Sequence, residues 1–216
     1  MSDGRVDRGR RGGGVRWAAP VDPPDTTRLF FAVPVPADAR ARVGQLMEQV
    51  QGEVGDGTAR IRWVRVEGLH LTLRFLGPTP NANIPPLIEG QDAVAAATAP
   101  FGVTLSGGGA FPSLAQPRSL WIGVVEGEAS LARLATEVTA AAEGCGLHLE
   151  TRPFAPHLTV GRTDGVRQAP AAAQALEAAA RDLEVRFDVD RIALFRSILG
   201  HGPARYEPVH EALLGG

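Results

Sequence analysis

The sequence HLTL (residues 70–73), within GLHLTLRFLG (68–77), recurs as HLTV (157–160) within RPFAPHLTVGR (152–162). Successive side chains of a β-strand alternate between its faces, so histidine and threonine share one face in each copy and the aliphatic residues occupy the other. Each copy therefore predicts a strand that presents an imidazole beside a hydroxyl and buries its aliphatic residues in the core. The residues expected to be buried are Leu71, Leu73, Leu158 and Val160.

One His-x-Thr motif alone is weak evidence, because a histidine at a strand edge is commonly structural and threonine is favoured in strands. Two copies separated by about half of the chain expected to fold are stronger evidence. They predict an internal duplication, in which each half supplies one histidine and one threonine.

The composition is that of a globular chain: 216 residues, 44% of them hydrophobic, with a formal net charge of −2. A long nucleic-acid track normally needs a strongly basic face, so any contact with nucleic acid should be local. All 22 basic residues are arginine, which we attribute to the nucleotide composition of the source genome. Cys145 is the only cysteine, which excludes an intrachain disulfide and favours the cytoplasm as the location.

Residues 1–27 are polar and rich in glycine and proline, and they predict a disordered leader. No apolar run follows the Arg10-Arg11 pair that could form a signal-peptide core, and no stretch approaches the length of a membrane span. Residues 28–216 are expected to form a single bilobal domain.

Hydrophobic periodicity divides this domain into strands and helices. Strands are expected at residues 28–35, 61–64, 69–77, 101–106, 119–126, 156–162, 185–197 and 204–214, and helices at 37–51, 84–98, 128–143 and 170–182. Because the two kinds of element mix without strict alternation, the expected class is α+β. We predict two mostly antiparallel sheets that line a central groove, with helices packed on the outside.

Two facing histidines can supply both proton transfers that cleavage of a phosphodiester needs. A neutral imidazole accepts a proton and an imidazolium donates one near neutral pH, so no metal is required. The neighbouring threonine hydroxyls can donate hydrogen bonds to the non-bridging phosphate oxygens as negative charge builds up on them.

At this point the residues resemble the 2H phosphoesterase superfamily, which is named for two His-x-Thr-x motifs. The resemblance is to its bacterial branch of RNA 2',3'-cyclic phosphodiesterases, formerly called 2'-5' RNA ligases, and covers nearly all of residues 28–210. The landmarks that carry it are, in order, RLFFAVPVP, HLTLRFLG, PRSLWIGV, RPFAPHLTVGR and IALFRSILGHGPARYEPV.

The resemblance implies a bilobal, cofactor-independent enzyme that opens the 2',3'-cyclic phosphate of an RNA end to a 2'-phosphomonoester. It implies His70 as the proton donor to the leaving 3'-oxygen and His157 as the proton acceptor from water. Thr72, Thr159 and Arg162 would bind the phosphate, and the same groove would serve reversible 2'-5' RNA ligation. The expected partners are RNA ends or oligonucleotides that carry the cyclic phosphate. We expect a monomer, with no obligate protein partner and no membrane contact.

Strand parity complicates the role of Arg162, which matches the basic position at the end of the family's second motif. Residues 157, 159 and 161 of a regular strand share a face, so Arg162 would point away from His157 unless the strand bends at Gly161. Arg74 has the parity of His70 and is a secondary candidate, with a solvent-exposed strand arginine as the alternative.

A terminal base also needs an aromatic platform. The aromatic residues in or near the landmarks are Phe30, Phe31, Phe75, Trp121 and Tyr206. Only one of Phe30 and Phe31 can face the groove, because neighbours on a strand diverge. We expect most of these five residues in the core, and the sequence leaves the base site open.

Other functions remain open from the residues alone. The groove could serve linear 2'-5' oligonucleotides or small cyclic nucleotides instead of RNA ends. The chain could also be a non-catalytic module that binds an RNA end or its phosphate. A metallohydrolase with histidine ligands ranks last, because no carboxylate-rich metal motif accompanies the two histidines.

Overall fold

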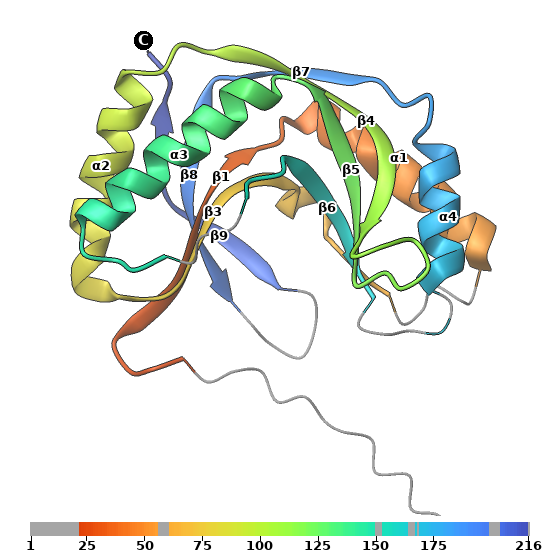
Figure 1. The fold of residues 1–216 in the computed structure, drawn as a ribbon, viewed down its shortest axis with the longest axis horizontal. Coiled ribbons are helices and arrows are strands. Elements are labelled where there is room, and N and C mark those ends of the chain that lie inside the picture. The colour runs from red at the N-terminus through yellow and green to blue at the C-terminus, as the bar shows by residue number, and fades with distance from the viewer. Residues whose placement is uncertain are drawn as a thin grey trace, which may run out of the picture.

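The computed structural model describes residues 22–55, 61–149, 153–163, 167, 169–198 and 204–215, which form a curved sheet flanked by helices (Figure 1). Residues 1–21 of the predicted leader lie outside the described residues. In chain order the elements are β1 (Thr26–Pro34), α1 (Ala37–Val54), β2 (Arg62–Trp63), η2 (Val66–Gly68), β3 (His70–Pro80), η3 (Asn81–Asn83), α2 (Ile84–Ala96), β4 (Phe101–Phe111), β5 (Ser119–Glu126), α3 (Glu128–Gly144), β6 (His157–Arg162), α4 (Ala169–Ala179), β7 (Val185–Val189), β8 (Arg191–Ile198) and β9 (Arg205–Leu213).

The strand order is symmetric about its centre. It runs β7-β4-β5-β6-β3-β1-β8-β9, with β2 paired to β6 off this path, and every pairing is antiparallel. The chain order β1-α1-β3-α2 is repeated as β5-α3-β6-α4, so β3 and β6 are equivalent strands at the centre. The predicted α+β class and internal duplication are confirmed. The two expected sheets, however, are joined edge to edge into one.

The joint between the central strands β3 and β6 is a single residue pair. Leu71 of β3 stands opposite Leu158 of β6, and both side chains are buried in the hydrophobic core. The other predicted core residues of the two motifs, Leu73 and Val160, are buried as well. The faces that carry histidine and threonine therefore lie together on the opposite side of the sheet from this core.

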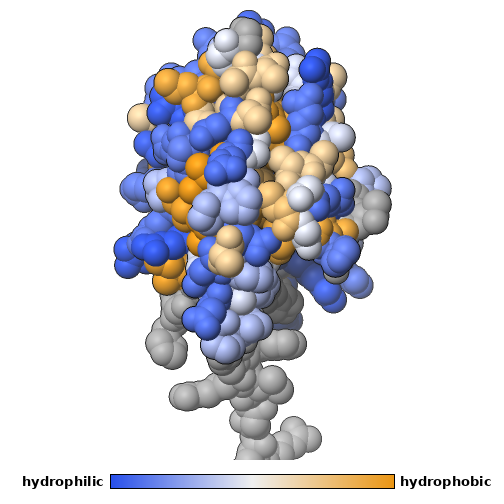
Figure 2. All heavy atoms as spheres, turned by 90° about the vertical axis from the view of Figure 1, so that its left-hand side faces the viewer, coloured by the Kyte–Doolittle hydropathy of each residue, from blue (hydrophilic) through white to orange (hydrophobic). Residues whose placement is uncertain are grey.

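The helices cover the outer flanks in pairs (Figure 1). Helices α2 and α3 contact each other on one flank, and α1 and α4 contact each other on the other. The flank of α2 and α3 shows hydrophobic and polar side chains interspersed (Figure 2). None of the described helices is both long and apolar enough to cross a membrane.

Several boundaries differ from the sequence prediction; β4, for example, runs to Phe111, where an end at residue 106 was expected. Residues 185–197, expected as one strand, form β7 and β8, which lie in opposite halves and pair with β4 and β1. Alternating burial ends at Val189 and gives way to three consecutive buried residues from Ile192, which is where the chain changes halves. Strand β1 begins at Thr26 rather than residue 28, and Thr26 pairs with Pro80.

The joint makes a prediction about stability. Truncating Leu158 to alanine removes a fully buried side chain where the halves meet, so we expect the free energy of unfolding to fall by about 2–5 kcal/mol. Val125→Ala is the matched control: the side chain is 57% exposed on the neighbouring strand, and the expected loss is below about 0.5 kcal/mol. Urea unfolding measures both, and equal losses would contradict the role of the joint.

Candidate active site

The register of the central strands brings the two motifs together. Leu71 stands opposite Leu158 in an antiparallel pair. Extending this register by one residue in each direction sets His70 opposite Thr159 and Thr72 opposite His157. Directly opposite residues of an antiparallel pair have Cβ atoms about 5 Å apart and project from the same face. The two histidines and two threonines thus form a four-residue cluster with a histidine at each of two opposite corners.

Both imidazole rings are held in the same way. Nδ1 of His70 lies 2.7 Å from the Gly68 carbonyl oxygen, and Nδ1 of His157 lies 2.7 Å from the Ala155 carbonyl oxygen. A carbonyl oxygen only accepts, so each Nδ1 carries the proton and each neutral ring has its lone pair on Nε2. Neither Nε2 atom has a hydrogen-bond partner among the described residues. Each ring can therefore offer Nε2 to a ligand.

The surroundings favour the neutral form of both rings. Burial lowers the pKa of His70 from its usual value near 6.5 to about 4, with further lowering by the charges of Arg162 and His157 and partial compensation by the Gly68 carbonyl. Burial also lowers the pKa of His157, opposed by the Ala155 carbonyl and assisted by Arg162. The electrostatic influence of Arg162 on both rings places its charge at the same site.

A bulge in β6 brings Arg162 to the site face. Trp121 of β5 pairs with Thr159 and Leu120 pairs with Gly161, so Val160 is an extra residue on β6. An extra residue shifts the alternation of the strand by one position, so Arg162 returns to the face of Thr159. The condition set for Arg162, a departure from regular alternation near Gly161, is thus met. Arg162 is exposed, and its guanidinium has no hydrogen bond or ion pair with any described residue.

The equivalent bulge in β3 has the opposite effect on Arg74. Phe31 pairs with Arg74 and Ala32 pairs with Thr72, which makes Leu73 the extra residue. Arg74 is therefore on the core face with Phe31, and the predicted shared parity with His70 is wrong. Phe75 lies on the face of His70 instead.

An aromatic cluster surrounds His70. The Phe30 ring lies 4.9 Å from the His70 ring, and Tyr206 meets His70 edge-on at 4.9 Å. Phe195 stacks on Phe30, and Phe75 lies against the Phe30 ring while remaining 60% exposed. Phe30 thus belongs to the site face, although other side chains cover it, whereas Phe31 belongs to the helix-side core.

A smaller aromatic cluster accompanies His157. The Phe111 ring meets the His157 ring edge-on, with 5.1 Å between the ring centroids. It lies tilted against the Trp121 ring at 5.2 Å, and the Phe111 side chain is 40% exposed. Phe111 was not among the predicted site residues, because the strand expected at 101–106 continues to Phe111. Phe195 was not predicted either, because strand periodicity does not reveal which partner strand brings an aromatic residue to a histidine. Of the five aromatic candidates, Phe30 and Phe31 are fully buried, Trp121 and Tyr206 are half-buried and Phe75 is exposed. The expectation that most of the five lie in the core is therefore wrong.

The threonine hydroxyls remain available. Thr72 and Thr159 are half-buried, and neither hydroxyl has a hydrogen-bond partner within the described ranges. Beyond Arg162, the end of β6 is anchored by the buried Thr163, whose hydroxyl donates to the Pro117 carbonyl and whose amide donates to the Arg118 carbonyl at 3.1 Å. In the part of the chain that the structure describes, no group of three or more His, Cys, Asp or Glu side chains could hold a metal ion.

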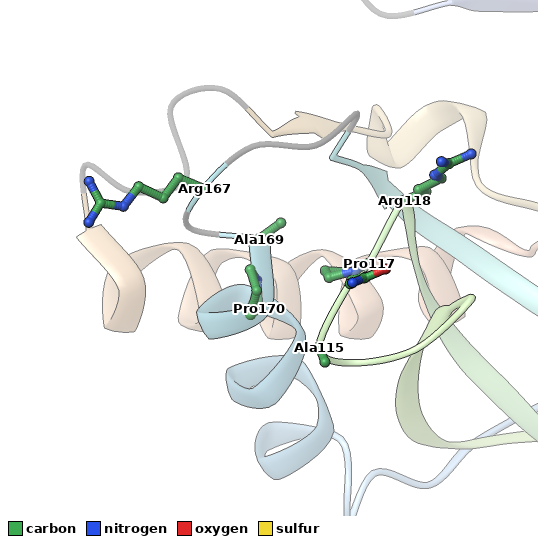
Figure 3. A pocket seen from close by; sticks show the side chains of 7 residues that line it. Ala115, Pro117, Arg118, Arg167, Ala169 and Pro170 are labelled. Carbon is green, nitrogen blue, oxygen red and sulfur yellow. The ribbon is translucent and has the colours of Figure 1, made fainter.

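A separate cavity of about 320 Å³ opens between the loop before β5 and the start of α4 (Figure 3). Its lining residues are Ala115, Gln116, Pro117, Arg118, Arg167, Ala169 and Pro170. Arg118 and Arg167 extend away from each other on opposite sides of it (Figure 3). None of the five predicted site residues lines this cavity, so it is distinct from the histidine–threonine cluster.

Comparison with known proteins gives consistent relatives. A family model described as the 2'-5' RNA ligase superfamily matches residues 29–200. An RNA 2',3'-cyclic phosphodiesterase of Geobacillus stearothermophilus is 37% identical over 183 residues, which cover 85% of this chain and 56% of that protein. An RNA 2',3'-cyclic phosphodiesterase of Aquifex aeolicus is 32% identical over 176 residues, covering 81% of this chain and 92% of that protein. The chain thus spans just over half of the first relative and nearly all of the second.

Solved structures agree with this assignment. The crystal structure of TT0787 of Thermus thermophilus has a TM-score of 0.69 and 28% identity, covering 88% of this chain and 98% of that one. The crystal structure of E. coli LigT complexed with NADP+ has a TM-score of 0.68 and 26% identity, covering 88% and 99%. On the family match and these relatives, the chain belongs to the 2'-5' RNA ligase superfamily.

Proposed function

We propose that this protein hydrolyses the 2',3'-cyclic phosphate of RNA ends to a 2'-phosphomonoester by metal-independent general acid–base catalysis. In the same site it joins such ends to 5'-hydroxyl ends by reversible 2'-5' ligation. The proposal rests on family membership and on the names of the relatives. It also rests on the cross-strand cluster of two histidines and two threonines with Arg162 beside it.

The cluster supplies each group that the reaction needs. Nε2 of His157 accepts a proton from water as the water oxygen bonds to phosphorus. The bond from phosphorus to the 3'-oxygen breaks, and Nε2 of His70 donates its proton to that oxygen. The hydroxyls of Thr72 and Thr159 donate hydrogen bonds to the non-bridging oxygens, where negative charge increases in the transition state.

A bound phosphate changes the protonation of both histidine rings, whose pKa values are lowered in the free protein. In the free protein both rings are neutral at neutral pH, and His70 lacks the proton that a donor needs. A bound phosphate anion favours the imidazolium forms and offsets the repulsion from Arg162. Substrate binding therefore raises the pKa of both rings, and the reactive complex is the one in which His70 is protonated and His157 is neutral.

Substituting either histidine tests the mechanism. We expect His70→Gln and His157→Gln each to lower kcat for a 2',3'-cyclic-phosphate oligoribonucleotide at least about a hundredfold, because each removes one proton transfer. His210→Gln is the control, since its ring pairs with Asp92 of α2 at 2.7 Å, and it should keep wild-type kcat.

The assay uses chelator-treated protein, and the position of phosphate in the product is determined. A 2'-phosphate made at full rate by wild type supports the proposal. Restoration of activity only by added metal, or full activity of either glutamine variant, would refute it.

The pH dependence gives an independent prediction. Both pKa values are below 6.5, so the population with one neutral and one protonated ring is largest at acidic pH, and kcat/KM should show a bell with its maximum below pH of about 6.5. Arg162→Gln removes a positive charge that lowers both pKa values, so the maximum should move to higher pH while its height falls. Arg162→Lys keeps the charge and should keep the position. If Arg162→Gln does not change the pH at which kcat/KM is largest, this coupling is contradicted.

A further inference from the structure

We propose, on the basis of the proposed function, that Phe111 and Trp121 form a second nucleoside site next to His157. This site would bind the nucleoside that contributes the 5'-oxygen in 2'-5' ligation and in cleavage of 2'-5' linkages. The observation that points to it is the presence of a separate, partly exposed aromatic ring on each side of the catalytic cluster. Phe75 is 60% exposed on the side of His70, and Phe111 is 40% exposed on the side of His157.

The sheet register aligns Phe111 with the phosphate-binding residues. Phe111 of β4 pairs with Ser119 of β5, and Ser119 pairs with Arg162 of β6. Directly opposite residues in neighbouring strands share a face, so Phe111 projects from the face that carries Arg162. Its ring then leans to within 5.1 Å of the His157 ring. A base on Phe111 would therefore lie beside the phosphate and not on a remote surface.

Trp121 of β5 packs against the Phe111 ring. Trp121 pairs with Gly109 on one side and Thr159 on the other, and its indole lies over Gly109. A Cβ atom at position 109 would lie only 2.4 Å from Trp121 Cζ2, so this close approach depends on glycine. The indole lies at 35° to the Phe111 ring with the centroids 5.2 Å apart. The two rings together provide a broad aromatic surface on which a base can stack.

The chemistry of phosphoryl transfer assigns the two sides. In ligation the 5'-hydroxyl oxygen bonds to phosphorus and gives its proton to Nε2 of His157. The bond to the 3'-oxygen breaks and that oxygen takes the proton of His70. In cleavage of a 2'-5' linkage the 3'-hydroxyl attacks and gives its proton to His70, and the departing 5'-oxygen takes the proton of His157.

The attacking and leaving oxygens lie on opposite sides of phosphorus in such a displacement. The nucleoside with the 5'-oxygen is therefore on the side of His157 and Phe111. The nucleoside with the 2'- and 3'-oxygens is on the side of His70 and Phe75. Hydrolysis of a cyclic phosphate places water where the 5'-oxygen would be, so it uses only the second of these nucleoside positions.

The main comparison uses three substrates and three proteins, with Phe111→Tyr added as a rescue variant. The substrates are a nucleoside 2',3'-cyclic phosphate, a 2'-5' linked dinucleotide, and the same dinucleotide lacking the base of its 5'-linked nucleoside. The proteins are wild type, Phe111→Leu and Phe75→Leu, and kcat/KM is measured for each pair. Leucine retains apolar packing against the histidine but removes the stacking ring, and Phe111→Tyr tests rescue by an aromatic side chain.

We expect Phe111→Leu to lower kcat/KM for the dinucleotide about tenfold more than for the cyclic phosphate, a size typical of one lost base–aromatic stack. On the dinucleotide that lacks the base, Phe111→Leu should lower kcat/KM little further, because the stack is already absent. Phe111→Tyr should restore kcat/KM for the complete dinucleotide. Phe75→Leu should lower kcat/KM for all three substrates by similar factors, because they share the nucleoside on its side.

Two kinds of result overturn the inference while leaving the proposed function intact. One is equal loss on all substrates in Phe111→Leu, which would mean that Phe111 acts only by placing His157. The other is selectivity that appears in Phe75→Leu instead. Hydrolysis of the cyclic phosphate by wild type without cleavage of the dinucleotide would overturn the inference together with reversible ligation, and would leave only the hydrolytic part of the proposed function. Failure of wild type to hydrolyse the cyclic phosphate would instead reject the proposed function, and the inference with it.

Discussion

The site depends on one contact, the pairing of Leu71 with Leu158 where the two halves of the sheet meet. This pair fixes the register, and the register decides that each histidine is set against the threonine of the other half. A slip of one residue would turn one strand over and bury its histidine and threonine in the hydrophobic core. Both leucines are buried among apolar residues, so the energy of the core enforces the alignment of the polar cluster on the opposite face.

Two bulges complete the site and also differentiate its halves. Each central strand has an extra residue directly after its threonine, Leu73 in β3 and Val160 in β6. Strand β3 has a second extra residue, Leu76, farther along. In each case the fifth residue after the histidine returns to the face of the histidine. That residue is Phe75 in one half and Arg162 in the other. The duplication thus gives two similar proton-transfer groups, while the equivalent positions beside them provide an aromatic ring on one side and a cation on the other.

Sequence periodicity predicted the parts of the fold that depend on one strand or helix at a time. The start of α1 at Ala37 is an example, as are the buried leucines of the two motifs and the shared face of each histidine and threonine. Strand pairing produced the features that it could not predict. Arg74 and Arg162 have opposite parity in an ideal strand, and bulges defined by the neighbouring strands reverse both. Phe111 reaches His157 from β4, which is two strands away in the sheet. The split of residues 185–197 between halves likewise depends on where each part finds a partner.

The central claim is that both imidazoles contact one phosphate, and the electrostatics of the free protein make this measurable. Burial and Arg162 lower the pKa of both rings, so a single phosphate anion between them should raise both values together. The most direct measurement is an NMR titration of the His70 and His157 ring resonances against pH, with and without a saturating nucleoside 2'-phosphate. The account predicts that one equivalent of ligand moves both titration curves to higher pH. A response of one ring alone, with the other unchanged at saturation, would contradict it.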